Sequence, residues 1–244
     1  MDWFIVEVME VNQMKEDLAR ANRILSNEEI LDGFGHVSAR HPDGDKMLVS
    51  SYQSPGLVQV EDLIEMSLDG DVLTKGVDEI YSENVIHRAI YQSRDDVGAV
   101  IHCHAPPLIP FTVTDAEIKP VTHQASPFHE GVPTFDDYDD ERGRMVVTEA
   151  EGARMADVLG DKQAQLLEGH GINIVGKNVR EATVLAMHLV QNAEHQLAAE
   201  GLGDPRYFTE PKETLEATAN DTVMKPRTIG RAWGYLVHRL GEEE

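Results

Sequence analysis

The chain has 244 residues and a single cysteine, so it cannot form an internal disulfide, and it is long enough to bury a core without one. It carries 44 Asp and Glu against 21 Lys and Arg, and its formal net charge of −23 argues against nucleic acid and anionic membranes as partners. No apolar run approaches the ~20 residues of a membrane span, and the first ten residues lack the features of a signal peptide, so we expect a soluble, cytoplasmic protein.

The hydrophobic pattern predicts helices and strands that interleave irregularly. The run 97–103 is continuously apolar after Asp95-Asp96, which is typical of a strand buried on both faces. Asn178 can cap the longest helix, with Glu181 in the capping-box position. In chain order, we expect helix 12–25, a turn at 32–35, strands 36–40, 46–50 and 63–67, helix 79–93, strand 97–103, helix 149–159, strands 165–167 and 172–175, helix 178–200 and a closing helix 229–240. This order predicts an α/β fold with a mixed sheet covered by helices on both faces.

Two histidines one residue apart give the main chemical signal. His102 and His104 follow each other at i and i+2, so in a strand both imidazoles lie on one face and can reach one ion, while Cys103 points away. With 11 histidines in the chain, this pair alone would be read as hydrogen-bonded core residues. Glu83, which we place on the preceding helix, and His170, between two later strands, complete a set of three imidazoles and one carboxylate that suits zinc.

Four segments carry a resemblance to the class II aldolase/adducin family. Three of them resemble its metal-site motifs, and Gly35–Arg40 resembles its N-terminal G-x-x-S-x-R segment. The order and spacing match from about Met14 to Glu200. The segments read G-H-V-S-A-R at 35–40, Y-S-E at 81–83, V-I-H-C-H-A at 100–105 and L-L-E-G-H-G at 166–171.

The resemblance implies a ligand set and an architecture. His102, His104 and His170 would bind Zn²⁺, or Mn²⁺ or Co²⁺ in its place, and Glu83 would be a displaceable ligand that acts as the acid/base residue. The implied fold is a single class II aldolase-like domain over 1–244, with its core at about 14–200 and a C-terminal extension at 201–244. Its three α/β/α layers enclose a central mixed, largely antiparallel sheet. Family members commonly form homotetramers with sites between subunits.

The chain departs from the family's sugar-phosphate enzymes at positions that hold phosphate in those relatives. It has Gly35-His36 where they have Gly-Asn, S-Y-Q-S-P-G at 51–56 where they have Thr-Gly, and Tyr81-Ser82 where they have Ser-Ser. A non-phosphorylated, carboxylate-bearing substrate is therefore favoured, as in the family's decarboxylases. His36, Arg40 and Ser54 are the candidates for holding that carboxylate.

The sequence leads to a zinc-dependent carbon–carbon lyase of aldolase or decarboxylase type. Such an enzyme cleaves a small hydroxy-carbonyl or carboxylate substrate through a metal-stabilised enediolate or enolate. Three alternatives stay open: a sugar-phosphate aldolase or 4-epimerase, a dehydratase, and a non-catalytic scaffold similar to the adducin head. A non-catalytic scaffold would be expected to have lost metal ligands, whereas all three histidines and Glu83 are present in this sequence.

The acidic surface generates the first testable prediction. Acidic residues are spread along the chain beside 41% hydrophobic residues, which leads to the hypothesis of a halophilic protein whose self-repulsion is screened by a high-salt cytoplasm. We expect a higher melting temperature in molar potassium chloride than in dilute buffer, measured by circular dichroism. Equal melting temperatures in the two buffers would remove the hypothesis and leave an ordinary acidic enzyme.

Overall fold

The computed structural model describes residues 3–77, 79–139, 143–208 and 211–243. The helices are α1 (Trp3–Asn27), α2 (Asn84–Ser93), α3 (Ile109–Thr112), α4 (Glu149–Leu159), α5 (Val179–Leu202), α6 (Lys212–Thr218) and α7 (Pro226–Leu240). The strands are β1 (His36–Arg40), β2 (Lys46–Ser50), β3 (Leu63–Ser67), β4 (Ala99–Cys103), β5 (Thr134–Phe135), β6 (Ala164–Leu167) and β7 (Gly171–Gly176). Short 3-10 helices occur at Pro55–Leu57, Val60–Asp62 and His123–Phe128, and a π-helical turn at Ala219–Val223.

The strands form one seven-stranded sheet in the order β3-β2-β1-β4-β7-β6-β5. Every neighbouring pair is antiparallel except β5 and β6, which are parallel. The structure therefore confirms the predicted mixed, largely antiparallel sheet. β4 lies in the middle of the order, between β1 and β7, and all five of its residues are buried.

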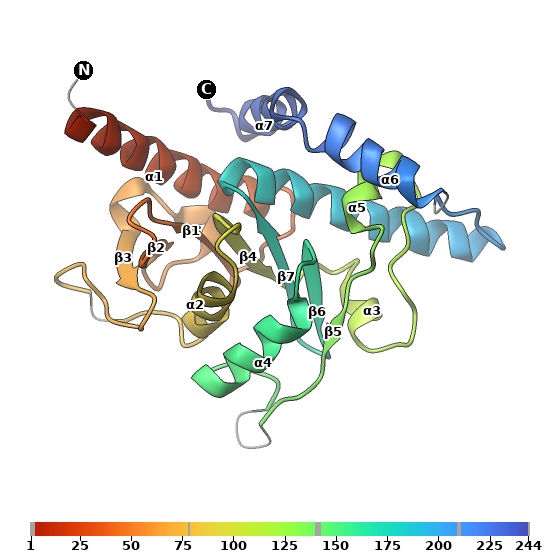
Figure 1. Ribbon diagram of the computed structural model, residues 1–244, viewed down its shortest axis with the longest axis horizontal. Helices are drawn as coiled ribbons and strands as arrows, with labels where there is room; N and C mark the ends of the chain where they lie inside the picture. The colour runs from red at the N-terminus through yellow and green to blue at the C-terminus, as the bar shows by residue number, and fades with distance from the viewer. Residues whose placement is uncertain (1–2, 78, 140–142, 209–210, 244) are drawn as a thin grey trace.

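Helices cover both faces of the sheet, as predicted. Figure 1 shows α1, α5 and α7 on one side of the strands and α2 and α4 on the other. Alternate residues of β4 follow this division: Ile101 and Cys103 pack in the cluster that contains residues of α1 and α5, and Val100 packs in the cluster that contains residues of α2 and α4. His102 shares the face of Val100, so its imidazole lies under α2 and α4.

The last helix closes one side of the molecule. α7 packs against both α1 and α5, and the Trp233 side chain is completely buried. The guanidinium of Arg180 on α5 lies over the Trp233 ring, 5.3 Å from its centroid. No helix within the described residues has the length and apolar character needed to cross a membrane.

Two local predictions need correction. The helix expected over 79–93 begins at Asn84, and Glu83 is its N-cap residue rather than part of the helix. The preceding turn is held by Tyr81, whose hydroxyl bonds to Ser50 Oγ at 2.5 Å and donates to the Gln53 carbonyl at 2.9 Å. The first helix also begins well before residue 12, at Trp3.

At the start of α5 the predicted N-cap residue is confirmed, but the predicted capping box does not form. Asn178 Oδ1 accepts the Glu181 N–H at 2.9 Å, so Asn178 is the N-cap. The Glu181 carboxylate accepts from the Lys177 N–H at 3.1 Å, one residue before the position that closes a capping box.

Candidate metal centre

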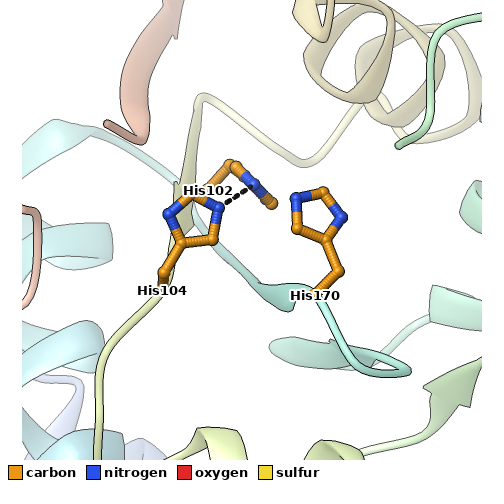
Figure 2. Close-up of side chains that lie close together, drawn as sticks. All are labelled: His102, His104 and His170. Atoms are coloured by element: carbon orange, nitrogen blue, oxygen red, sulfur yellow. Dashed lines mark hydrogen bonds between the residues drawn. The ribbon is translucent and has the colours of Figure 1, made fainter. Parts of the chain in front are cut away.

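Three histidines from two separate parts of the chain converge at one end of the sheet. His102 is on β4, His104 follows that strand directly, and His170 lies in the turn between β6 and β7. The Nε2 atoms of His102 and His104 are 3.2 Å apart. One nitrogen from each of the three rings lies within 4.8 Å of the others. Figure 2 shows the three rings facing one another.

Backbone packing explains why glycines flank His170. Gly169 has φ +60°, a conformation that side chains other than glycine rarely adopt. A Cβ atom on Gly171 would lie 2.5 Å from the Cys103 carbonyl oxygen and 2.8 Å from His104 Cδ2. The E-G-H-G segment therefore brings β7 close to β4 and places the third imidazole beside the first two.

A row of polar side chains crosses four strands and includes His102. In the sheet register, His36 on β1 and Asn173 on β7 lie on either side of His102, and Gln165 on β6 is next to Asn173. His102 Nδ1–H donates to Asn173 Oδ1 at 2.9 Å. The Asn173 amide is oriented by Gln165 Oε1, which accepts its Nδ2–H at 3.4 Å.

This orientation leaves the Nε2 lone pair of His102 directed at His104. The Nδ1 atom of His104 lies 3.8 Å from Asp32 Oδ1, an arrangement that favours the proton on Nδ1 and a lone pair on Nε2 there too. Two nitrogen lone pairs at 3.2 Å repel each other unless a proton or a cation lies between them. The donor set of three imidazoles, two of them with outer partners that favour a lone pair on Nε2, fits a divalent metal ion such as zinc.

Burial keeps His102 and His170 neutral. It lowers the pKa of His102 well below its usual value, and repulsion from His36, His170 and His104 lowers it further. Burial, followed by repulsion from His104, lowers the pKa of His170 to about 4. Because metal binding requires unprotonated nitrogen, the site is ready for a cation at neutral pH.

Glu83 lies beside the His170 corner of this cluster. Its Oε1 is 3.6 Å from His170 Nε2 and accepts the Val146 N–H at 3.2 Å. Burial raises the pKa of Glu83 to about 7, so the carboxyl group can gain or lose a proton near neutral pH. As the N-cap residue of α2, Glu83 makes no side-chain capping bond to the helix, and its carboxyl group lies next to His170 instead.

A cavity of about 570 Å³ opens in front of these residues. His36, Ser54, Glu83, His104 and His170 all line it. Much of the remaining wall is aromatic or thioether, formed by Phe34, Tyr52, Tyr81 and Met145. Within the described part of the chain, no Lys or Arg lines this cavity.

The structure brings two of the three predicted carboxylate-holding residues to the cavity. His36 and Ser54 line it, whereas Arg40 lies outside it. The Arg40 guanidinium donates to the backbone carbonyls of four residues at 2.5 to 3.1 Å and lies 4.8 Å from the Tyr91 ring centroid. These carbonyls belong to Gly44, Tyr91, Arg94 and Val97. Arg40 therefore braces the far end of β1.

Sequence reasoning missed most of the supporting residues. Asn173 and Gln165 lie in apolar runs without any motif, and only the strand register places them beside His102. His87 did carry a signal, its i+4 spacing from Glu83, and it contacts His36 rather than joining the three-histidine cluster. Cys103 faces the opposite side, and burial raises its pKa to about 12, so the thiol is unreactive.

Known proteins resemble this chain in sequence and in fold. The family model described as Class II Aldolase and Adducin N-terminal domain matches residues 16–197. The chain is 28% identical to the decarboxylase tropJ of Talaromyces stipitatus, over 89% of this chain and 90% of that protein. It is 27% identical to the 3,4-dihydroxyphthalate decarboxylase of Arthrobacter keyseri, over 71% of this chain and 73% of that protein. The solved structure of L-fuculose 1-phosphate aldolase from Glaciozyma antarctica has the same fold, with a TM-score of 0.77 and 23% identity over 95% of this chain and 91% of that one.

The first prediction from this site concerns the metal. We expect about one zinc ion per chain in protein purified without added metal, and its loss in the His104→Ala variant, measured by elemental analysis. The control is His195→Ala, which removes an exposed histidine from α5 and should retain the ion. No metal in the wild type, and none taken up on titration with zinc, would contradict the assignment.

The second prediction concerns Glu83 in the metal-free protein. Since its folded pKa of about 7 exceeds the ordinary value of 4.5, this group makes the fold less stable as pH rises from about 4.5 to 7, and the full cost applies above pH 7. Each pH unit corresponds to about 1.4 kcal/mol, so Glu83→Gln should raise the unfolding free energy at pH 8 by up to about 3 kcal/mol. At pH 4 the two proteins should be equally stable in urea titrations. A variant that is less stable at pH 8 would show that the carboxylate is not desolvated.

Proposed function

The chain belongs to the class II aldolase and adducin family, and from this premise we propose that it is a zinc-dependent carbon–carbon lyase that decarboxylates a small, non-phosphorylated hydroxy-carbonyl acid. One observation carries the proposal: the three-histidine cluster and a protonatable Glu83 lie beside a cavity whose described lining residues include no Lys or Arg. A site that binds a phosphate group is expected to contain a Lys or Arg side chain that pairs with it. The relatives named as decarboxylases support the same direction.

The three histidines would hold the group that supplies the electrophile. A divalent ion held by His102, His104 and His170 would act as a Lewis acid toward substrate oxygens, which stabilises the negative charge left when a bond to carbon breaks. Zinc suits three imidazoles best, and manganese or cobalt are the alternatives we retain.

The residues of the chain account for the remaining steps. When carbon dioxide leaves, the electron pair of the broken bond stays on the substrate, and the carbon that carried the carboxylate must gain a proton. Glu83, with a pKa of about 7, is protonated in a large fraction of molecules at neutral pH and can donate that proton. The resulting carboxylate then takes up a new proton from solvent. Its side chain is 12% exposed at the cavity wall, so the proton is delivered in a largely dry environment.

The cavity wall matches the organic part of such a substrate. Phe34 and Tyr52 are 70% and 61% exposed, and both line the cavity together with Tyr81. The Tyr52 and Tyr81 rings lie 5.7 Å apart, centroid to centroid. This wall offers stacking and apolar contact, which a ring or alkyl chain uses better than a polyhydroxylated sugar does.

The second candidate is a sugar-phosphate aldolase. The hydroxyls of Ser54 and Ser82 at the cavity favour it, because neutral donors can also hold a phosphate. A 4-epimerase or dehydratase would use the same metal centre. A non-catalytic scaffold is disfavoured because the complete histidine set and Glu83 are assembled in contact.

Three further properties are part of the proposal. We propose a homotetramer, a cytoplasmic location and a halophilic source, the first from the family resemblance and the other two from the composition. The net charge of −23 supports the halophilic reading and also predicts attraction of divalent cations toward the protein.

The activity is tested with the zinc-loaded protein and two groups of substrates. We expect release of carbon dioxide from hydroxy-substituted aromatic or 3-oxo acids, and no aldehyde from fuculose 1-phosphate or ribulose 5-phosphate. Glu83→Gln should lower kcat by about 10²- to 10⁴-fold because the proton donor is lost. The exposed Glu117→Gln variant is the matched control and should keep full activity. Saturable aldehyde release from a sugar phosphate, without decarboxylation, would replace this proposal by the second candidate.

A further inference from the structure

Four buried side chains form a continuous hydrogen-bonded chain that ends at the cavity. His36 Nδ1 lies 2.5 Å from His87 Nε2, and His87 Nδ1 lies 2.6 Å from Ser38 Oγ. Ser38 Oγ in turn lies 2.8 Å from the Tyr91 hydroxyl. His36 and Ser38 come from β1, and His87 and Tyr91 from α2. Of the four, only His36 lines the cavity.

Every member of this chain carries one proton at neutral pH. His87 and Ser38 are completely buried, Tyr91 is 1% exposed and His36 is 4% exposed. Burial lowers the pKa of His87 to about 3, with a further contribution from His102, and burial raises the pKa of Tyr91 above its usual value. These four hydrogen-bonded side chains are therefore neutral. Their four protons can form a continuous run of hydrogen bonds in only two directions, which we call the first and the second order.

In the first order, each group donates toward the cavity. Tyr91 O–H donates to Ser38, Ser38 O–H donates to His87 Nδ1, and His87 Nε2–H donates to His36 Nδ1. The proton of His36 is then on Nε2, the ring nitrogen left for a ligand in the cavity. In the second order every bond is reversed, and His36 Nε2 carries a lone pair instead.

The buried end of the chain decides between the two orders. Within the described residues, Ser38 Oγ is the one side-chain hydrogen-bond partner of the Tyr91 hydroxyl. The backbone of Val100 also bonds to this hydroxyl, in a contact that lowers the Tyr91 pKa and therefore donates to the oxygen rather than accepting its proton. The reversed order would leave the Tyr91 proton without an acceptor in a fully buried position, which costs about 1–3 kcal/mol. The first order gives every donor within the four-residue chain an acceptor, leaves only His36 Nε2–H for a ligand, and is therefore favoured.

We propose that Ser38 and His87, with Tyr91 closing the chain, are positioning residues that hold the proton of His36 on Nε2 and so present a neutral N–H donor to the substrate carboxylate beside the three-histidine centre. The chemistry of the cavity calls for such a donor. An anion bound where no described Lys or Arg lines the wall depends on neutral hydrogen-bond donors, and an imidazole of the opposite tautomer would repel it. His36 stacks on His102, with ring centroids 5.1 Å apart, and lies outside the metal-binding group.

The inference rests on the proposed function only for the identity of the anion. The tautomer of His36 is a property of the folded chain and can be measured without any substrate. The first experiment therefore addresses the tautomer and the second addresses the carboxylate.

The first experiment is nitrogen NMR of zinc-loaded protein with ¹⁵N-labelled histidine. We expect His36 to show a protonated Nε2 and an unprotonated Nδ1. Ser38→Ala removes the donor to His87 and should shift His36 toward the other tautomer. Ser93→Ala is the matched control, because it removes a hydroxyl from the same helix, one that donates to the Ile90 carbonyl outside this hydrogen-bonded chain, and it should leave the His36 signals unchanged.

Two results would overturn the proposal at this stage. One is a wild-type His36 protonated on Nδ1. The other is a His36 tautomer that is the same in Ser38→Ala as in the wild type. If Ser38→Ala does not fold, His87→Gln tests the same link, since the amide can donate from either side and releases His36 from a single tautomer.

The second experiment compares two small anions by calorimetric titration of the zinc-loaded protein. Glycolate offers only a hydroxyl and a carboxylate for the metal, whereas tartronate offers a second carboxylate for His36. We expect the preference for tartronate over glycolate to fall about tenfold or more in Ser38→Ala and in His36→Phe, and to persist in the control Ser93→Ala. An unchanged preference in His36→Phe would overturn the carboxylate role. Because both readouts are independent of turnover, the absence of decarboxylation would refute the proposed function and leave this inference standing.

Discussion

A buried imidazole at the centre of a sheet constrains much of this site. His102 is completely buried on β4, and a buried ring with two nitrogens has to satisfy both. Asn173 accepts from one nitrogen, and the other faces His104. The neighbouring strands are arranged to meet this requirement, because β1 supplies His36 on one side of His102 and β7 supplies Asn173 on the other. The three-histidine cluster is therefore part of a polar row built into the sheet.

The electrostatics of the interior differ from those of the surface. The chain as a whole is strongly acidic, yet Glu83, the carboxyl group closest to His170, is shifted toward its neutral form by burial. The imidazoles around it are shifted toward their neutral form for the same reason. Binding of a divalent cation to such a group of neutral ligands recovers part of the cost of their desolvation, so the site favours a metal even though each residue alone would remain uncharged.

The segment 35–40 shows how one motif serves two tasks. Alternate residues of β1 face α2, so His36, Ser38 and Arg40 lie on the same side of the sheet. They differ in their position along the strand. His36 is at the cavity end of the strand, and Ser38 contacts α2 through His87. Arg40, at the other end, donates hydrogen bonds to backbone carbonyls at the end of α2 and in the loops after α2 and β1. A shared face thus does not imply a shared function.

The sequence by itself determined the order of most helices and strands, the α/β class and the convergence of the histidines and Glu83. Hydrophobic periodicity and the motif spacing are local properties, and they were sufficient for helix 149–159 and for strands 36–40, 46–50 and 63–67. Tertiary structure alone decided the start of α2, the place of Arg40 and the partners of His102. α2 begins at Asn84 because Tyr81 is hydrogen-bonded to Ser50 and Gln53. The Arg40 guanidinium donates to backbone carbonyls of other loops, and Asn173 lies beside His102 only because β4 pairs with β7. Each of these outcomes depends on contacts between residues far apart in the chain, which no local pattern encodes.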